Sequence, residues 1–230
     1  MHDSWIKAVC FDYYGTLVDA GKPFDDINTW FASFLHRRKR PDLQKKFSRF
    51  FRRRLAVYQA RACFVSGEKM LDECYFESCK HCEIEPDFQG FTRWMEDAFI
   101  LPPAFEDAME ALASIKTQCQ VGLISNADNR FLSRSIDQNS FQFDFIVSSE
   151  TTGANKPNSA IFRVALDLVP YLPSEILMVG DSITEDILPA QALGMRALWL
   201  NRHRQDCPDS IQCIHALVEI KEHLSKDHRN

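Results

Sequence analysis

The sequence predicts a doubly wound α/β fold, in which a parallel β-sheet is covered by helices on both faces, with a helical module inserted into it. Short apolar runs recur along the chain, and segments with helical spacing separate most of them. Strands that alternate with helices are typical of a parallel sheet covered on both sides. One gap between successive apolar runs is far too long for a single crossover helix, and this gap indicates the insertion.

Five apolar runs are interpreted as buried strands. Strands of a parallel sheet are buried on both faces, so they are near-continuous apolar stretches rather than alternating patterns. The runs are Ile6 to Phe11, Val121 to Ile124, Phe143 to Val147, Ile176 to Val179 and Met195 to Leu200. Between them, apolar residues at helical spacing fall in Phe105 to Ile115 and in Ile161 to Val169.

The inserted module extends from about Asp19 to Pro102, and its apolar residues recur at helical rather than alternating spacing. This pattern predicts a helical cap of about four helices. The sequence Leu101-Pro102-Pro103 is expected to stop the last helix, because proline cannot continue it. The predicted division is therefore an α/β core of residues 1–18 and 102–230 and a helical cap of residues 19–101.

Composition indicates a globular protein, because 45% of the 230 residues are apolar and 26% are charged. No apolar run is long enough to cross a bilayer, and the N-terminus lacks the features of a signal peptide. We therefore expect a cytoplasmic protein that does not contact membranes.

The eight cysteines are expected to be mostly reduced. Cys79-Lys80-His81-Cys82 resembles half of a zinc site, but no second pair with ligand spacing follows. Cys74 and Cys79 also fall inside an expected helix. Ordinary packing of the Cys74, Cys79 and Cys82 thiols is therefore favoured over structural zinc.

The net charge of −5 conceals a basic segment, residues 37–54, with ten basic residues and a single acid, Asp42. The other positions therefore sum to about −14. Such a segment attracts anions or forms only the solvated face of a helix. We expect a small anionic substrate and no nucleic-acid partner, and the sequence leaves the oligomeric state open.

Polar residues follow three of the predicted strands at the point where each strand ends. Asp12 follows Phe11, Ser125-Asn126 follows Ile124, and Gly180-Asp181 follows Val179. One such residue alone would be interpreted as a helix cap. Ligands of open parallel sheets bind beyond the carboxyl ends of the strands, so three such sites together with a loop lysine indicate a functional site.

Together these segments resemble the four motifs of the haloacid dehalogenase-like (HAD) hydrolase superfamily, with a helical insertion similar to the cap of its first class. The implied fold is a HAD-like Rossmannoid core with an α-helical cap. The matching segments are Phe11-Asp12-Tyr13-Tyr14-Gly15-Thr16-Leu17, Leu123-Ile124-Ser125-Asn126, Lys156-Pro157 with Ile161-Phe162, and Val179-Gly180-Asp181-Ser182 with Asp186.

The resemblance implies a hydrolase in which Asp12 is a covalent nucleophile and Mg²⁺ is the cofactor. A carboxylate that attacks a phosphate dianion needs a cation to offset the repulsion, and magnesium prefers oxygen ligands. The implied metal ligands are Asp12, Asp181 and the backbone carbonyl of Tyr14. Lys156 would balance charge during catalysis, and Asp186 would support the metal's water shell or Lys156. The expected substrate-binding residues are Ser125, Asn126 and Thr16.

Tyr14 departs from the phosphatase pattern, which has a second aspartate at this position as the general acid. Losing a general acid typically slows a reaction by about 10²–10⁴-fold. Tyrosine is found here in the metal-independent 2-haloacid dehalogenases of the superfamily, whose halide leaves without a proton. Those enzymes also use a cap arginine, and the segment Phe50 to Leu55 with Tyr58 loosely resembles the helix that carries it.

The fourth motif favours the phosphatase. Dehalogenases have uncharged residues where this chain has Asp181, and a carboxylate pair formed by Asp12 and Asp181 needs a counter-ion. The predicted function is therefore a Mg²⁺-dependent phosphatase that acts on a small phosphate ester, with a 2-haloacid dehalogenase as the alternative. A weakly active scaffold or binding protein that uses its basic cap is the second alternative.

Overall fold

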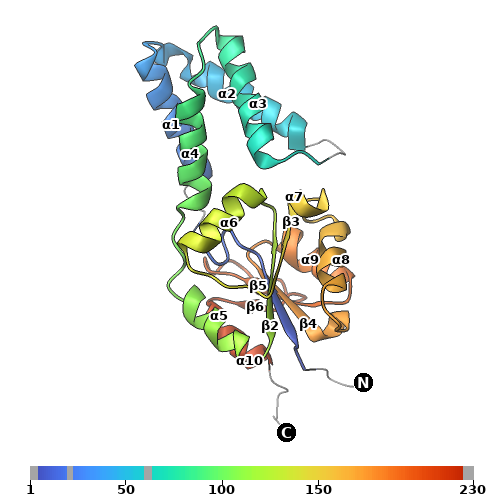
Figure 1. Ribbon diagram of the computed structural model, residues 1–230. Coiled ribbons are helices and arrows are strands. Elements are labelled where there is room, and N and C mark those ends of the chain that lie inside the picture. The colour runs from blue at the N-terminus through green and yellow to red at the C-terminus, as the bar shows by residue number, and fades with distance from the viewer. Residues whose placement is uncertain (1–4, 20–22, 60–63, 225–230) are drawn as a thin grey trace. The chain divides into compact units, whose positions relative to one another are not determined.

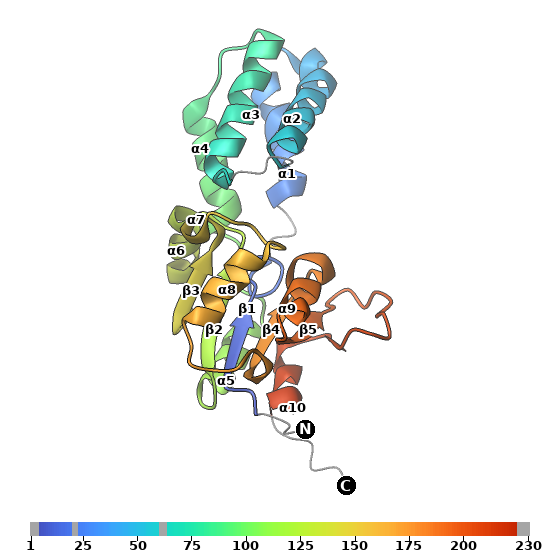
Figure 2. The same cartoon turned by 90° about the vertical axis from the view of Figure 1, so that its right-hand side faces the viewer.

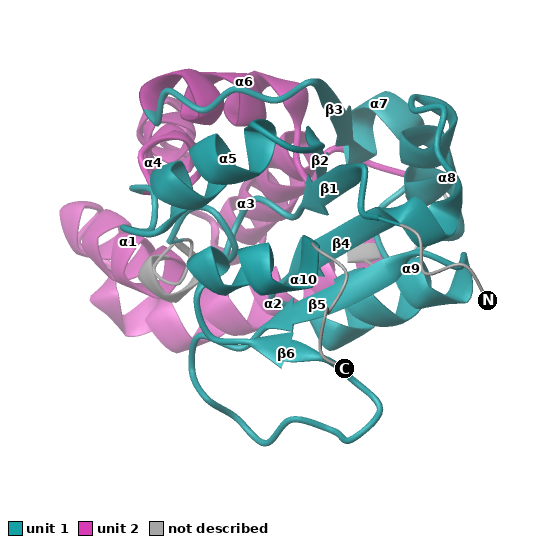
Figure 3. Ribbon diagram, turned by 90° about the horizontal axis from the view of Figure 1, so that it is seen from below, with its two compact units in different colours: residues 1–19, 103–126, 139–230 teal, residues 20–102, 127–138 magenta. Residues whose placement is uncertain are grey.

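A computed structural model describes residues 5–19, 23–59 and 64–224. It divides into two compact units, shown in different colours in Figure 3. Unit 1 consists of Met1–Asp19, Pro103–Asn126 and Asn139–Asn230, and unit 2 of Ala20–Pro102 and Ala127–Gln138. Within the described ranges, no helix has the length and apolar character required to cross a membrane.

Unit 1 contains a six-stranded parallel sheet with the order β3-β2-β1-β4-β5-β6, of which β1 to β5 are labelled in Figure 2. The predicted fold class is thereby confirmed, and all five predicted strands are present. The short sixth strand was not predicted. The strands are β1 (Ala8–Phe11), β2 (Gln120–Ser125), β3 (Phe145–Ser148), β4 (Ile176–Gly180), β5 (Arg196–Leu200) and β6 (Cys213–Ile214).

β1 lies at the centre of the sheet, where the strand order reverses. The chain adds β2 and β3 on one side of β1 and then β4, β5 and β6 on the other. Phe11, the last residue of β1, is in register with Leu123 of β2 and Val179 of β4. The next backbone N–H, that of Asp12, donates to the Val179 carbonyl at 2.9 Å. Asp12 therefore lies at the topological switch point, where α/β sheets bind their ligands.

Helices cover both faces of this sheet. Figure 3 shows α8 and α9 on one face and α5 and α10 on the other. Asn158 caps the N-terminus of α8, where its side chain accepts from the Ala160 N–H at 3.0 Å, and the helix buries Ile161 and Phe162 against the sheet. The helices of unit 1 are α5 (Ala108–Lys116), α7 (Ser149–Thr152), α8 (Ser159–Asp167), α9 (Leu188–Ala192) and α10 (Lys221–Leu224).

Unit 2 is helical, as predicted, and the described part of the inserted segment contains four α-helices (Figure 1). They are α1 (Pro23–Arg37), α2 (Gln44–Gln59), α3 (Gly67–Cys82) and α4 (Phe88–Ile100), with a short 3₁₀ turn at Pro41–Leu43. Aromatic side chains form half of its buried core, and the ring of Phe31 lies 4.8 Å from Phe47 and 4.9 Å from Phe51. The side chain of Phe24, expected to join this core, lies outside the described residues.

The predicted division of the chain differs from the observed units at one helix. α6 (Asn129–Gln138) was assigned to the α/β core, whereas it packs against α4 in unit 2. The carboxylate of Asp128, just before α6, accepts from the backbone N–H groups of Gly67 and Glu68 at 2.9 and 2.5 Å. Phe131 is buried in the aromatic core of unit 2. Helical spacing identifies the apolar face of α6 but not the layer against which that face packs.

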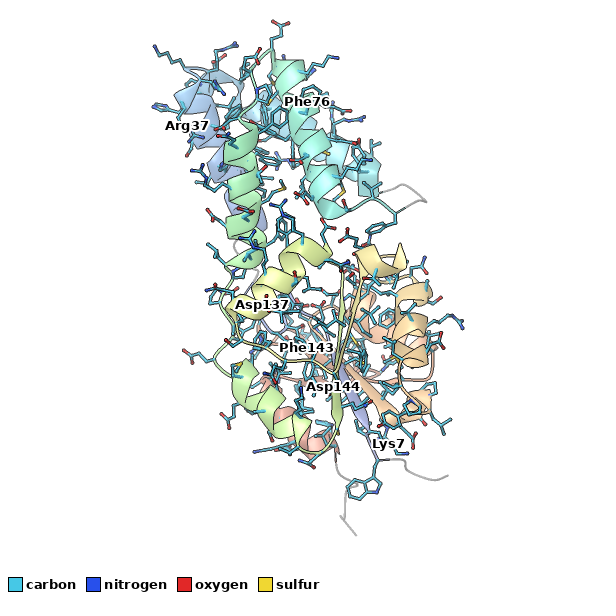
Figure 4. All side chains as sticks on the ribbon, viewed as in Figure 1. Lys7, Arg37, Phe76, Asp137, Phe143 and Asp144 are labelled. Carbon is cyan, nitrogen blue, oxygen red and sulfur yellow. The ribbon has the colours of Figure 1, made fainter. Side chains whose placement is uncertain are left out.

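The aromatic core of unit 2 leads to a stability prediction. Phe31 is fully buried between two other rings, so Phe31→Ala leaves a cavity and should lower the free energy of unfolding by about 3–5 kcal/mol. Urea unfolding monitored by far-UV circular dichroism measures this change. Phe76→Ala is the matched control, because Phe76 is 48% exposed on the surface of the same unit (Figure 4). An equal effect of the two substitutions would contradict the assignment of this core.

Candidate active site

The centre of the candidate site is the buried ammonium group of Lys156. Its Nζ atom lies 2.5 Å from Asp12 Oδ1 and 2.6 Å from Asp186 Oδ1. All three side chains are almost completely removed from solvent, with exposed fractions of 2%, 9% and 1%. These residues come from three separate segments of the chain and meet at the carboxyl edge of the sheet.

The backbone after β1 and after β4 places two of these three side chains. Asp12 directly follows β1, and Asp186 lies in a single π turn, Ile183–Ile187, after β4. The Ser182 N–H donates to Asp186 Oδ2 at 3.1 Å. Gly180 permits this arrangement, because a Cβ atom there would lie 2.2 Å from Asp186 Oδ2.

Asn126 holds the loop that carries Lys156. Its Oδ1 atom accepts from the Lys156 backbone N–H at 2.6 Å, and its Nδ2 atom donates to the Lys156 carbonyl at 3.1 Å. The same Nδ2 atom lies 3.3 Å from Glu185 Oε2. Asn126 was predicted to bind substrate, and its observed contacts are those of a residue that positions the lysine.

Asp181 is the third carboxylate of the site. One oxygen atom each from Asp12, Asp181 and Asp186 fall within 4.8 Å of one another. The backbone at Gly15, with φ of +88°, passes so close that a Cβ atom there would lie 2.4 Å from Asp181 Oδ2. A glycine is therefore required both by the left-handed conformation and by the space that Asp181 occupies.

The electrostatics of the site are dominated by burial and by an excess of negative charge. Burial raises the pKa of Asp12 to about 7, and Asp186 and Asp181 add to this effect while Lys156 opposes it. Desolvation and the proximity of Asp186 also raise the pKa of Asp181, although its exposure to water screens these effects. Burial lowers the pKa of Lys156, but attraction to Asp12 and Asp186 more than offsets this and raises it overall.

The donor set fits a hard divalent cation. Three carboxylates share one ammonium group, so the ionised cluster carries an uncompensated negative charge. Oxygen ligands of this kind suit Mg²⁺. Asp181 faces solvent, and such exposure would allow a hydrated ion to approach. The structure thus brings together the side chains of Asp12 and Asp181 that were predicted as metal ligands, while their ligand role stays a prediction.

Three further predicted residues lie around Asp12. The fully buried Thr16 donates its hydroxyl to Asp12 Oδ2 at 3.4 Å. Ser125 Oγ, at the end of β2, is buried and has no hydrogen-bond partner within the described ranges. A buried hydroxyl without a partner is rare and indicates a place for a ligand acceptor. Tyr14 is half-buried, with its ring edge-on to Tyr13 at 5.0 Å.

Two residues near the site were not predicted. The indole N–H of Trp199 donates to the Asp181 carbonyl at 2.9 Å, which fixes the backbone of a predicted metal ligand. Trp199 lies in an apolar run, and nothing in that run indicates that its ring nitrogen has a specific partner. Glu185, which contacts Asn126, could have been found as an acid within the fourth motif segment, one residue before Asp186.

The other expectations concern unit 2. Cys74, Cys79 and Cys82 are buried, and among the described residues the aspartate cluster is the only group of acidic, histidine or cysteine side chains close enough together to hold a metal ion. Nine of the ten basic side chains in residues 37–54 are exposed. The exception is Arg54, which is half-buried and forms an ion pair with Glu77.

The raised pKa of Asp12 leads to a prediction for the metal-free protein. Stability should fall as pH rises from about 4 to about 7, because native Asp12 retains a proton that the unfolded chain has already released. Asp12→Asn cannot titrate, so its thermal midpoint should fall less over this range. Thermal unfolding in the presence of a chelator at several pH values tests this.

Asp144→Asn is the control for that experiment, because it also removes one carboxylate from unit 1 but lies away from the site, paired with Lys116 (Figure 4). It should show the pH dependence of the wild type. If the thermal midpoint of Asp12→Asn fell with pH as steeply as that of the wild type, the prediction would be contradicted.

Comparisons with known proteins identify the family of the chain. Residues 6–194 match the family model described as haloacid dehalogenase-like hydrolase. The pyrimidine 5'-nucleotidase YjjG of Escherichia coli (strain K12) is 31% identical over 125 residues, which cover 52% of this chain and 56% of that protein. The aligned part thus spans about half the length of this relative.

Two solved structures have the same fold. The 2-haloacid dehalogenase from Pseudomonas syringae pv. Tomato DC3000 matches with a TM-score of 0.72 and 24% identity, covering 94% of this chain and 97% of that one. The HAD phosphatase from Thermococcus onnurineus matches with a TM-score of 0.70 and 18% identity, covering 95% and 98%. The family model spans most of the sequence, and the predicted motifs and helical insertion are present. The chain therefore belongs to the haloacid dehalogenase-like hydrolases.

Proposed function

We propose that this protein is a Mg²⁺-dependent hydrolase of small phosphate monoesters that uses Asp12 as its nucleophile. The observation that carries the proposal is the third carboxylate, Asp181, which joins Asp12 and Asp186 within 4.8 Å although the cluster has only one ammonium group. Without a bound metal, the excess negative charge of the ionised cluster would not be neutralised.

In the proposed reaction, a carboxylate oxygen of Asp12 attacks phosphorus and the bond from phosphorus to the ester oxygen breaks. The products of this step are an aspartyl-phosphate and an alcohol, which takes up one proton. Water then attacks the phosphorus, so inorganic phosphate is released and the Asp12 carboxylate is restored. Lys156 would favour the ionised form of Asp12 and offset negative charge on the transferring group.

Other residues of the site would bind the phosphoryl group and the metal. Ser125 Oγ is a buried donor at the end of β2 with no protein partner among the described residues, so it is proposed to bind a phosphoryl oxygen. Asp12, Asp181 and the Tyr14 carbonyl would hold the magnesium ion. The ion would neutralise the repulsion between the Asp12 carboxylate and a phosphate dianion. Two relatives named above, a pyrimidine 5'-nucleotidase and a HAD phosphatase, act on phosphate compounds according to their names.

A 2-haloacid dehalogenase is the second candidate, and Tyr14 is the observation that favours it. In that reaction Asp12 displaces halide from carbon, the halide leaves without a proton, and water hydrolyses the resulting ester. A general acid at position 14 is then unnecessary. The dehalogenase named above shares the fold. The charge of Asp181 weighs against this candidate, because it favours a bound cation at the site. A cation bound to Asp12 would weaken the attack of the Asp12 carboxylate on carbon.

One screen distinguishes the two candidates. Purified protein is incubated with phosphate monoesters and with 2-haloacids, each with Mg²⁺ and with chelator. We expect phosphate release that requires Mg²⁺ and that Asp12→Asn abolishes, while the control Asp144→Asn keeps wild-type activity. Halide release that persists in chelator would replace the proposal with the dehalogenase. The absence of both activities would refute both candidates.

A second prediction concerns the missing general acid. Tyr14→Asp would place a carboxylic acid where the phosphatase pattern has one, so we expect kcat for phosphate esters to rise at least about tenfold. Tyr14→Phe is the matched control and should leave kcat within about twofold of wild type, because a phenol of ordinary pKa transfers protons poorly at neutral pH. A large loss of activity in Tyr14→Phe would show instead that the phenol takes part in the reaction.

A further inference from the structure

Arg202, two residues after β5, reaches the backbone of the loop that follows the nucleophile. One of its terminal nitrogens, Nη2, donates to the Thr16 carbonyl at 2.9 Å, across 186 positions of sequence. The side chain of Arg202 is 17% exposed, so this contact is largely shielded from water. None of the four motifs includes Arg202.

The guanidinium group is held in place by Asp107. Nη2 of Arg202 donates to Asp107 Oδ1 at 3.0 Å, and Nη1 donates to Asp107 Oδ2 at 3.2 Å. Asp107 Oδ2 also accepts from the Leu217 backbone N–H at 2.7 Å. The ring of Phe105 lies 3.9 Å from Arg202 Cζ. A bidentate ion pair over an aromatic ring leaves the arginine little rotational freedom.

The Thr16 carbonyl belongs to a tight loop on which two parts of the site depend. The Thr16 hydroxyl contacts Asp12 Oδ2, and Gly15 packs against the Asp181 carboxylate. Within the loop, the Leu17 and Val18 N–H groups donate to the Tyr13 carbonyl at 2.8 and 3.1 Å. A displacement of Thr16 would therefore alter both the orientation of Asp12 and the space around Asp181.

We propose that Arg202 is a positioning residue for the hydrolysis reaction: oriented by Asp107, it fixes the Thr16 carbonyl and thereby holds the loop that orients Asp12. This inference rests on the proposed role of Asp12 as nucleophile, in either the phosphatase or the dehalogenase reaction. Arginine suits the task, because its planar fork of donors binds two acceptors at once, whereas lysine offers a single flexible ammonium.

The kinetic test compares Arg202→Met and Arg202→Lys with wild type, using whichever substrate the wild type hydrolyses. Small displacements of reacting groups lower the reaction rate strongly. We expect kcat to fall about 10- to 100-fold in Arg202→Met while KM stays within about threefold. Arg202→Lys should recover only part of the loss, and it serves as the better-folding variant if the methionine substitution impairs expression.

A double-mutant cycle with Thr16→Val separates positioning from general destabilisation. If Arg202 acts through Thr16, then the double variant Thr16→Val/Arg202→Met should have a kcat less than about threefold below that of Thr16→Val alone. Effects that multiply in the double variant would overturn the proposal, and so would an unaltered kcat in Arg202→Met.

Hydrogen exchange supplies a measurement that does not depend on activity. The Leu17 and Val18 amides should exchange faster in Arg202→Met than in wild type, because their loop has lost an anchor. Unchanged exchange would also overturn the proposal. If the wild type hydrolysed neither class of substrate, the proposed function would fail, while this measurement would still test whether Arg202 anchors the loop.

Lys7→Met is the matched control. Lys7 forms an ion pair with Glu175 at 2.8 Å in the same unit, near the end of β1 opposite to Asp12 (Figure 4). Its loss should lower the thermal midpoint slightly at most, with wild-type kcat and wild-type exchange at Leu17 and Val18. A fall in kcat in this control comparable to that of Arg202→Met would show that any lost ion pair has the same effect, which would overturn the specific role of Arg202.

Discussion

The buried ammonium group of Lys156 imposes the constraint on which the arrangement of unit 1 depends. A buried charge that loses its partner typically destabilises a protein by about 3–5 kcal/mol, so Lys156, Asp12 and Asp186 must come together when the sheet forms. The loop before α8 is thereby tied to the central strand and to the turn after β4. Asp181 adds a third carboxylate to a cluster with a single ammonium group, and this imbalance of charge is what suits the site to a cation.

Much of the fold could be predicted because its strands are buried on both faces. β1 and β4 are continuous apolar runs bounded by polar residues, and such runs have few other interpretations. β6 has two residues, too few to form a pattern. The layer to which α6 belongs was also beyond prediction, because its place is decided by contacts such as those of Asp128 with Gly67 and Glu68, far away in sequence.

The candidate site was predictable to the extent that its residues follow strand ends. Asp12, Ser125 and Asp181 share one edge of the sheet because parallel strands all point the same way. Trp199 and Arg202 escaped prediction for a different reason, since each donates to a backbone carbonyl. Any residue can supply a carbonyl, so the sequence carries no sign of which one is chosen.

The assignment of α6 to unit 2 affects how the protein could be divided. Because residues 127–138 belong to that unit, the polypeptide passes between the units four times rather than twice. Phe131, on α6, is buried against the aromatic side chains of the insertion, 5.5 Å from Phe99. Excising residues 20–102 would leave this apolar surface uncovered on the remaining fragment. The helical insertion is therefore not an independent cassette that could be exchanged between relatives without also redesigning α6.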